Sequence, residues 1–223
     1  MLDTVREEFN KRSDEIDTLF AHIEALSDKG KESFKDDDGG LVSILVASLS
    51  LMLYNQIEST AFSCVEAIYD GLEELSVSFD SLVESFKERV LNDCRGAGRS
   101  GGSILKKIGS QGIGVGIAHA SLKLDTVFSG NVDARKIRTV LGEYNLKVTA
   151  LSSGNKGEAL LDIKEARKSL AHGSSSFESY GRNIVVSDLK RQINEVREFM
   201  GHLIDLTEEY FESKRYLAET GAA

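Results

Sequence analysis

Hydrophobic positions repeat along most of the chain with the period of an α-helix. Near the N-terminus, apolar residues are separated by three or four positions or a multiple of these, and charged residues occupy the other face. The apolar residues are Val5, Phe9, Ile16, Leu19, Ile23 and Leu26. This pattern predicts an amphipathic helix that ends near Ser27.

The same reading predicts five further helical segments. A helix over 41–75 is apolar on nearly all sides at first, which places its first half at the centre of a bundle. A third segment ends before Arg95, and shorter helices follow at about 133–144 and 156–171. The last helix begins near Ser187, a residue type that suits an N-cap. The third segment carries Phe79, Leu82, Val83, Phe86, Val90 and Leu91, and the stripe of the last helix is Leu189, Ile193, Val196, Met200, Leu203, Leu206 and Tyr210.

Two polar stretches interrupt this pattern. The acidic run Asp36–Gly40 predicts a solvated loop or the approach to a helix, because it lacks the alternating ligands and distal Glu of a calcium loop. The glycine-rich stretch 96–116 is the least helical part of the chain. A phosphate-binding P-loop would end in Gly-Lys-Ser/Thr, but Gly116 is followed by Ile117 and Ala118. A flexible insertion or lid is therefore favoured over a nucleotide loop.

No strand pattern and no internal repeat interrupt the helical reading. The predicted fold class is all-α: an antiparallel helical bundle with helical and glycine-rich insertions, forming one domain over 1–223. Within it, 1–40 is an N-terminal helix and acidic loop, 41–95 the central helices, 96–130 the glycine-rich insertion, and 131–216 the C-terminal helices.

Composition adds limits to this picture. Proline is absent, which favours long helices, and the net charge of −9 argues against a protein that coats nucleic acid, so any RNA contact requires a local basic patch. Cys64 and Cys94, without an apolar signal core at the N-terminus, predict free thiols and a cytoplasmic location. The apolar stretch Leu41–Tyr54 is shorter than the ~20 residues that span a bilayer, so it predicts a buried helix and no membrane partner.

Among the four histidines, His172 has the context that suits chemistry. His22 lies near an apolar stripe, which favours a structural role, and no zinc-type spacing surrounds His119. No histidine-based metal site and no cofactor are expected, whereas a carboxylate site stays open. Arg167 precedes His172 with four residues between them, and glycine follows at position 173.

Arginine and histidine serve complementary steps of RNA cleavage. Histidine titrates near neutral pH and can move a proton to or from a ribose oxygen. The planar guanidinium of arginine can donate two hydrogen bonds to phosphate oxygens at once. Both stabilise a phosphorane on which negative charge accumulates. Since the 2′-OH of RNA is itself the nucleophile, no metal is required, and the expected products carry a 2′,3′-cyclic phosphate and a 5′-OH.

The spacing alone does not identify the pair, because Arg197 and His202 share it. Positions five apart on a continuous helix point ~140° away from each other. Arg197 and His202 lie within a predicted helix, so we expect them to diverge on the surface. For Arg167 and His172 the helix can end at 171–173, which frees the imidazole to swing toward the guanidinium. The alternative is an arginine on a helix flank and a histidine near a C-cap, where it favours the helix dipole.

The surroundings favour the catalytic interpretation. The segment 160–173, which ends in Arg-Lys-Ser-Leu-Ala-His-Gly, resembles the signature of HEPN domains (higher eukaryotes and prokaryotes nucleotide-binding), in which an Arg and a His lie four to six residues apart. The stretches 54–58 and 128–133, and the late helix from Ser187, resemble the MAE-type and RiboL-PSP-like HEPN families of prokaryotic toxin and defence systems. The resemblance covers roughly 41–215.

This resemblance implies a dimeric helical bundle with the Arg/His sets facing each other across the twofold axis. It implies metal-independent endoribonuclease activity in a toxin–antitoxin or anti-phage system, with RNA as substrate, a homodimer partner and a cognate antitoxin or defence protein. By this resemblance Arg167 and His172 are the catalytic pair, and Tyr54 and Glu58 are supporting residues for which simple packing and helix-surface solvation are the alternative. Lys168 is a further supporting residue, and Lys168, Ser174 and Arg182 are candidate RNA-binding residues.

One residue departs from the HEPN signature. A small polar residue usually follows the signature arginine, but here it is Lys168. This lysine either adds phosphate affinity or marks a non-catalytic HEPN module that binds nucleotide, RNA or a partner protein. A third hypothesis is a structural helical subunit that uses the glycine-rich insertion as a docking lid.

Overall fold

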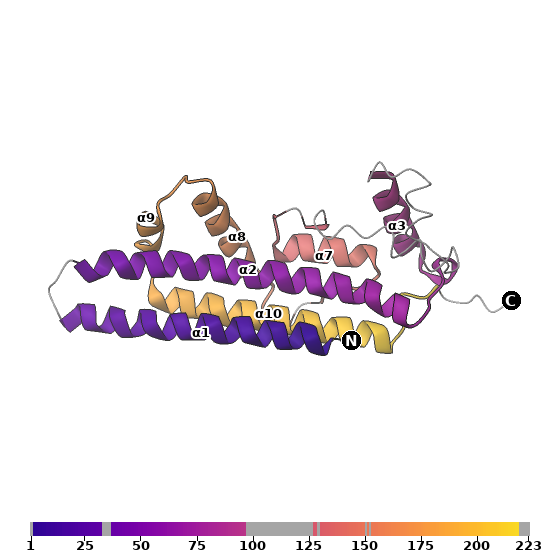
Figure 1. The fold of residues 1–223 in the computed structure, drawn as a ribbon, viewed down its shortest axis with the longest axis horizontal. Coiled ribbons are helices and arrows are strands. Elements are labelled where there is room, and N and C mark those ends of the chain that lie inside the picture. The colour runs from indigo at the N-terminus through magenta and orange to yellow at the C-terminus, as the bar shows by residue number, and fades with distance from the viewer. Residues whose placement is uncertain are drawn as a thin grey trace.

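Three long helices lie side by side along the molecule (Figure 1). They are α1 (Asp3–Glu32), α2 (Asp37–Glu74) and α10 (Val186–Glu212). The structure, a computed structural model, describes residues 2–32, 37–96, 127–128, 130–149, 151 and 153–218. Helix α1 runs antiparallel to the other two, and α2 and α10 run in the same direction (Figure 1).

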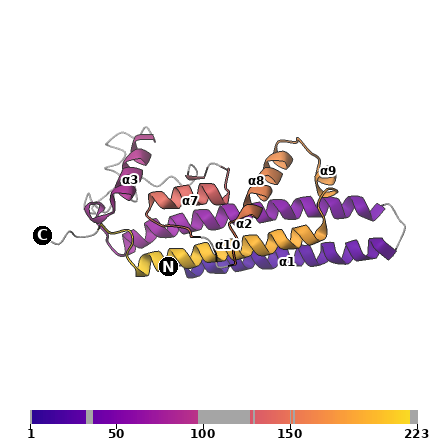
Figure 2. The same cartoon turned by 180° about the vertical axis from the view of Figure 1, so that it is seen from behind.

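Shorter helices cover α2 on the side away from α1. Helices α8 (Glu158–Ala171) and α9 (Phe177–Gly181) pack directly on α2, and α7 (Ala134–Glu143) lies between α8 and α3 (Glu84–Gly96), as the view from behind also shows (Figure 2). A short 3-10 helix, η1, spans Phe79–Ser81. All regular elements among the described residues are helical, which confirms the predicted all-α class.

The predicted apolar stripes form the core. In α1, Val5, Phe9, Ile16 and Ile23 are buried, and Leu19 packs partly buried against them. In α10 the whole predicted stripe from Leu189 to Tyr210 is buried. Burial of these side chains against α2 is the main favourable contribution to folding, at about 25 cal/mol per Å² of apolar surface. The helical period therefore predicts correctly which faces meet.

Polar contacts fix how α1 lies against its neighbours. The buried Gln56 amide in α2 donates to the Phe9 carbonyl at 3.3 Å and to Ser13 Oγ at 2.7 Å. On the outer side, Arg6 pairs with Asp205 at 2.9 Å and Arg197 pairs with Asp17 at 2.7 Å, so α1 and α10 are joined at two points along their length. A shift of α1 by one turn would break all of them, so they select one register.

Two predicted boundaries around α2 and α3 differ from the structure. Asp37–Gly40, predicted as part of an acidic loop, form the first turn of α2. Helix α3 does not end before Arg95 but continues to Gly96. Residues 97–126 of the predicted glycine-rich insertion, which include His119, lie outside the described residues, as does Asp36.

In the last third of the chain, the structure differs from the prediction at two further points. Ser187 is not the N-cap of α10, because the helix begins at Val186 and Val185 occupies the cap position without a side-chain hydrogen bond. Helix α9 was not predicted. Its five residues are too few to show a hydrophobic period, although the Ser176 hydroxyl accepts a hydrogen bond from the Ser179 N–H as an N-cap does.

The apolar character of α2 reflects its central place. By length and composition Gly39–Glu74 would suffice to cross a membrane, but half of its most apolar window is buried inside the protein. Cys64 in this helix is a free thiol with no exposure, and burial raises its pKa to about 12. Such a thiol is unreactive and serves packing. The side chain of Cys94 lies outside the described residues.

Candidate functional site

Helix α8 ends as predicted, at Ala171. Gly173 adopts a left-handed φ of 68°, and its N–H donates to the Leu170 carbonyl at 3.2 Å. The Ser174 N–H donates to the Ser169 carbonyl at 3.0 Å. These two bonds form a Schellman motif, which satisfies the last carbonyl groups of the helix and places His172 at the C-cap.

Arg167 projects from α8 toward α2. Its guanidinium carbon lies 5.2 Å from the centre of the Tyr54 ring, a distance typical of cation–π contact. The loop before α7 closes the site from another direction, because a Cβ built on Gly130 would lie 3.4 Å from Arg167 Nη2. The guanidinium is thereby held by a ring and a backbone, and it forms no ion pair with a described residue.

Tyr54 links three parts of the fold. Its hydroxyl accepts the Val132 N–H at 3.3 Å and donates to Glu58 Oε1 at 3.2 Å. Only 1% of the residue is exposed, and burial raises its pKa to about 12. Tyr54 is therefore a neutral donor at physiological pH, not a base. Its position explains how α2, α8 and the loop before α7 meet around Arg167.

A partly buried ion pair anchors this loop. Lys164 Nζ lies 2.7 Å from Asp133 Oδ2, and 13% and 15% of the two side chains are exposed. Asp133 also caps α7 by accepting the Lys136 N–H at 2.8 Å. Burial alone would raise the pKa of Asp133, but the hydrogen bonds from Lys164 and from backbone N–H groups hold it below its ordinary value. The pair fastens the start of α7 to α8, one turn before Arg167.

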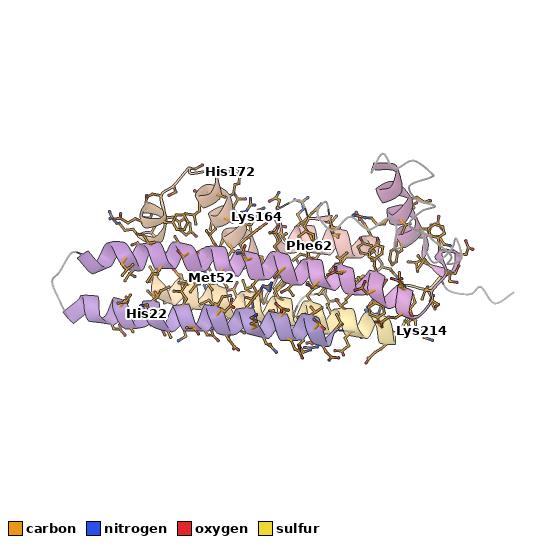
Figure 3. All side chains as sticks on the ribbon, viewed as in Figure 1. His22, Met52, Phe62, Lys164, His172 and Lys214 are labelled. Carbon is orange, nitrogen blue, oxygen red and sulfur yellow. The ribbon has the colours of Figure 1, made fainter. Side chains whose placement is uncertain are left out.

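Arg167 and His172 do not touch within one chain. Arg167 lies over α2, whereas His172 is exposed at the outer end of α8 (Figure 3). No hydrogen bond joins the two residues, although both are described. The expected approach of the imidazole to the guanidinium is therefore not seen. At ~100° per residue, five positions along a helix turn the two side chains ~140° apart, and the Schellman turn begins too late to reverse this.

The other predicted site residues fall into two groups. Tyr54 and Glu58 lie together with Arg167, whereas Lys168 and Ser174 are exposed at the end of α8 beside His172. Lys168 lies in the last turn of α8, 3.8 Å from Glu165, where its charge also suits the helix dipole. Arg182 belongs to neither group: it is the C-cap residue of α9 and pairs with Glu178.

The second Arg–His spacing leads to no site. Arg197 pairs with Asp17 of α1, and His202 Nε2 lies 3.5 Å from Thr149 Oγ1. The two side chains diverge as predicted. His22, expected to have a structural role, is instead exposed on α1, because it lies just outside the buried stripe (Figure 3).

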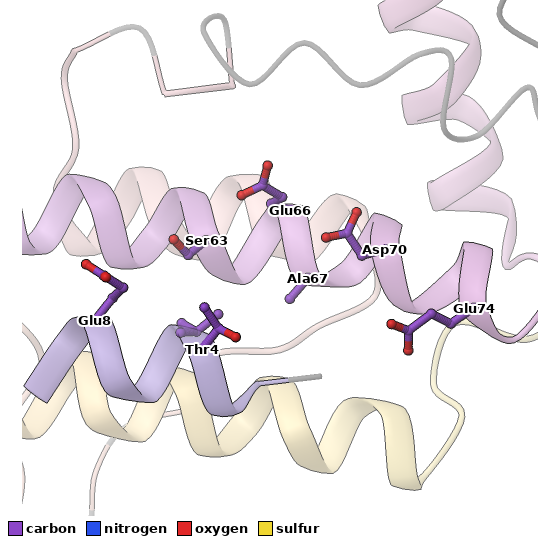
Figure 4. Close-up of a pocket in the computed structure, with 8 residues that line it drawn as sticks. Thr4, Glu8, Ser63, Glu66, Ala67, Asp70 and Glu74 are labelled. Carbon is purple, nitrogen blue, oxygen red and sulfur yellow. The ribbon is translucent and has the colours of Figure 1, made fainter.

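A pocket between α1 and the C-terminal half of α2 has the wrong charge for nucleic acid. Its volume is about 240 Å³, and four carboxylates surround it (Figure 4). These are Glu8, Glu66, Asp70 and Glu74. Phosphate would be repelled there, and none of the predicted site residues lines it. Among the described residues there is also no group of three or more His, Cys, Asp or Glu side chains that suits a metal ion.

The residues that fix the loop beside Arg167 were not among the predicted site residues. Asp133 and Lys164 were not singled out, and neither was the role of the Gly130 and Val132 backbone. A signal existed for Asp133, because an aspartate before Ala-Arg-Lys-Ile is an N-cap pattern. Lys164 carries no such signal, since only the fold brings its helix beside the loop.

The all-helical bundle, with Arg167 in the last turns of α8 and His172 at its C-cap, has the fold class that the HEPN resemblance implies. More specifically, residues 1–216 match the MAE_28990-like HEPN family, and the chain belongs to it. No curated protein and no solved structure matches the chain.

Proposed function

We propose that this protein is a metal-independent endoribonuclease whose catalytic residues are Arg167 and His172. The observation that carries the proposal is the way in which the surrounding residues position the Arg167 guanidinium. One face of its guanidinium rests on Tyr54, the loop at Gly130 limits its movement, and it forms no ion pair with a described residue. A positioned cation of this kind suits a phosphate that gains charge in the transition state.

The chemistry requires two proton transfers. The 2′-oxygen of RNA attacks the adjacent phosphorus while its proton passes to a base, and the departing 5′-oxygen takes a proton from an acid. The exposed His172 imidazole suits either role, and Arg167 stabilises the phosphorane. The products are a 2′,3′-cyclic phosphate and a 5′-OH, with no bond made to the protein.

A second copy of the chain completes the site in this proposal. Within one chain no hydrogen bond joins the exposed His172 to Arg167, so in this proposal two α8 helices face each other to surround one phosphate. Helix α8 presents a suitable face, because Leu161, Glu165, Lys168 and His172 recur at intervals of four, three and four residues and are all exposed. Leu161 is 49% exposed and supplies apolar area for such a contact.

The test is cleavage of a labelled RNA in EDTA. Wild type, Arg167→Ala and His172→Ala are compared with His22→Ala, which removes an exposed histidine on α1. We expect cleavage to 2′,3′-cyclic phosphate ends by wild type and His22→Ala, and a loss on the order of 10²-fold or more in the two site variants. Equal cleavage by all four proteins would contradict the proposal.

The second candidate function is a HEPN module that binds RNA, nucleotide or a partner protein without cutting. Lys168 favours it, because an exposed lysine replaces the small polar residue of the signature beside Arg167. Lys168→Asn separates the two candidates. If wild type binds RNA without cleaving it and Lys168→Asn does cleave RNA, then Lys168 is the residue that prevents catalysis. The biological setting we propose is a cytoplasmic toxin or defence effector held by a cognate partner.

A further inference from the structure

A second pocket lies at the start of α7, close to Arg167. Its volume is about 250 Å³. Pockets that enclose drug-sized ligands measure about 300–1,000 Å³, so this one suits a smaller group such as part of one nucleotide. It is lined by Phe128, Asn131, Asp133, Arg135, Lys136 and Thr139.

The loop 130–133 separates this pocket from the Arg167 guanidinium. Gly130 faces Arg167, while Asn131 and Asp133 line the pocket. Because a residue spans at most ~3.5 Å of backbone, this segment covers no more than about 10 Å. Adjacent nucleotides of one RNA strand can therefore occupy both places.

The charges of the pocket favour an anion. Arg135 and Lys136 line it and form no ion pair with the residues that the structure describes. The one carboxylate, Asp133, already binds Lys164 and caps α7, so its charge is compensated. Of the three basic residues of α7, Arg135 and Lys136 line the pocket, whereas Arg138 donates to the Lys156 carbonyl and lies over the Phe199 ring. In a protein whose net charge is −9, these two cations form the kind of local basic patch that RNA binding requires.

Asn131 adds a side chain that can recognise a base by hydrogen bonding. Its side chain is exposed and has no hydrogen-bond partner among the described residues. A carboxamide offers both a donor and an acceptor, which matches the edge of an unpaired base. A purely electrostatic anion site would not need such a group.

We propose that this pocket is a binding subsite for the RNA nucleotide that lies next to the cleaved dinucleotide in the same strand. Arg135 and Lys136 contact its phosphate groups, and Asn131 forms hydrogen bonds with its base. The subsite rests on the proposed function, because the substrate is the same RNA strand. RNA longer than a dinucleotide should therefore bind more tightly than its contacts with Arg167 and His172 alone would allow.

The experiment compares two matched double variants. Arg135→Ala/Lys136→Ala removes the pocket cations, and Lys11→Ala/Arg12→Ala removes an adjacent Lys–Arg pair from α1, on the other side of α2. Cleavage is measured with an RNA octamer and with a dinucleotide. Binding is measured by fluorescence anisotropy with a 2′-O-methyl RNA octamer, which lacks the nucleophile, at several salt concentrations.

We expect the pocket variant to raise the KM for the octamer by on the order of tenfold or more and to leave cleavage of the dinucleotide nearly unchanged. The slope of log K for octamer binding against log salt concentration should fall in magnitude by about 0.7 for each lost cation. The control should match wild type.

Other outcomes separate the two proposals. If wild type cleaves the octamer and both double variants do so equally well, the subsite is wrong and the proposed function stands. If wild type binds the 2′-O-methyl octamer through Arg135 and Lys136 but cleaves no RNA, the subsite stands and the ribonuclease proposal fails. If wild type neither binds nor cleaves RNA, both are overturned. Asn131→Ala provides a finer check, since it should reduce discrimination among octamers that differ at one base.

Discussion

Tyr54 is the residue on which the geometry of the site depends most. It lies in the middle of α2, yet it contacts α8 through its ring and the loop before α7 through its hydroxyl. The ring and the hydroxyl therefore have separate tasks. The ring supports the Arg167 guanidinium, and the hydroxyl satisfies a buried backbone N–H.

Substitution of Tyr54 separates these tasks. Tyr54→Phe leaves the Val132 N–H without its acceptor and should lower the free energy of unfolding by about 1–3 kcal/mol while preserving most cleavage. Tyr54→Leu also removes the ring face, worth about 0.5–2 kcal/mol to the cation, and should reduce kcat/KM much further. Urea unfolding and RNA cleavage measure the two effects. Equal loss of activity in both variants would show that the hydroxyl, not the ring, is needed.

At the scale of elements, helix α9 is seated on α2 by a close approach that only glycine permits. A Cβ built on Gly181 would lie 1.8 Å from the Ser43 carbonyl oxygen. Both groups belong to the backbone, so neither side can yield by a rotamer change. This contact fixes the segment that follows His172, and thus where the chain leaves the site.

Gly181→Ala should force α9 away from α2. We expect a loss of at least about 2 kcal/mol in the free energy of unfolding, or local opening of α9 seen as faster hydrogen exchange. The control is Gly201→Ala in α10, where nothing lies within 4 Å of the added Cβ. There the helix gains about 0.5–1 kcal/mol, because alanine is the better helix former. Similar effects of the two substitutions would contradict the close packing of α9.

The ion pair between Asp133 and Lys164 gives the connection between α7 and α8 a pH dependence. The pKa of Asp133 is lowered, so its contribution is present above the ordinary value of about 3.9 and is lost as pH falls through the folded value. The pKa of Lys164 is raised by its bond to Asp133, so that contribution is lost only at high pH. Both charges are present at neutral pH.

Asp133→Asn keeps the cap of α7 and removes the ion pair. We expect it to be less stable than wild type by about 1–2 kcal/mol at pH 7, since the pair is shielded from water on most sides. The difference should shrink below about pH 4, as Asp133 of the wild type becomes protonated. Denaturant unfolding at pH 7 and pH 3 measures it, and a difference that stays constant with pH would exclude the ion pair as its source.

Helices long enough to repeat the helical pattern of hydrophobic residues were predictable, whereas contacts between elements were not. The stripes of α1 and α10 identify their buried faces, and Gly173 identifies the end of α8. By contrast, α9 is too short to carry a period, and Lys164 looks like any helix-surface lysine until Asp133 is beside it. Arg167 and His172 could be found as a pair, but their divergence follows from the rotation between them along the helix. The site is thus only partly encoded in local sequence.

At the scale of the whole molecule, the separation of Arg167 from His172 makes the proposed activity depend on association. The single chain offers a supported guanidinium on one side of α8 and an exposed imidazole at its outer end. A second copy that docks along the exposed face of α8 would bring its own imidazole to the first chain's phosphate site. Leu161 is the one large apolar side chain on that face.

Leu161→Glu should weaken this association without unfolding the monomer. Because Leu161 is 49% exposed, the substitution should change the free energy of unfolding of the monomer by no more than about 0.5 kcal/mol. Leu91→Glu is the matched control, since Leu91 on α3 is 55% exposed and lies away from α8. Sedimentation and RNA cleavage are measured over the same range of protein concentration. We expect wild type and Leu91→Glu to gain specific activity as the dimer forms, and Leu161→Glu to stay monomeric and nearly inactive. An active Leu161→Glu monomer would mean that one chain suffices, and that His172 reaches Arg167 by a rearrangement of the α8 terminus.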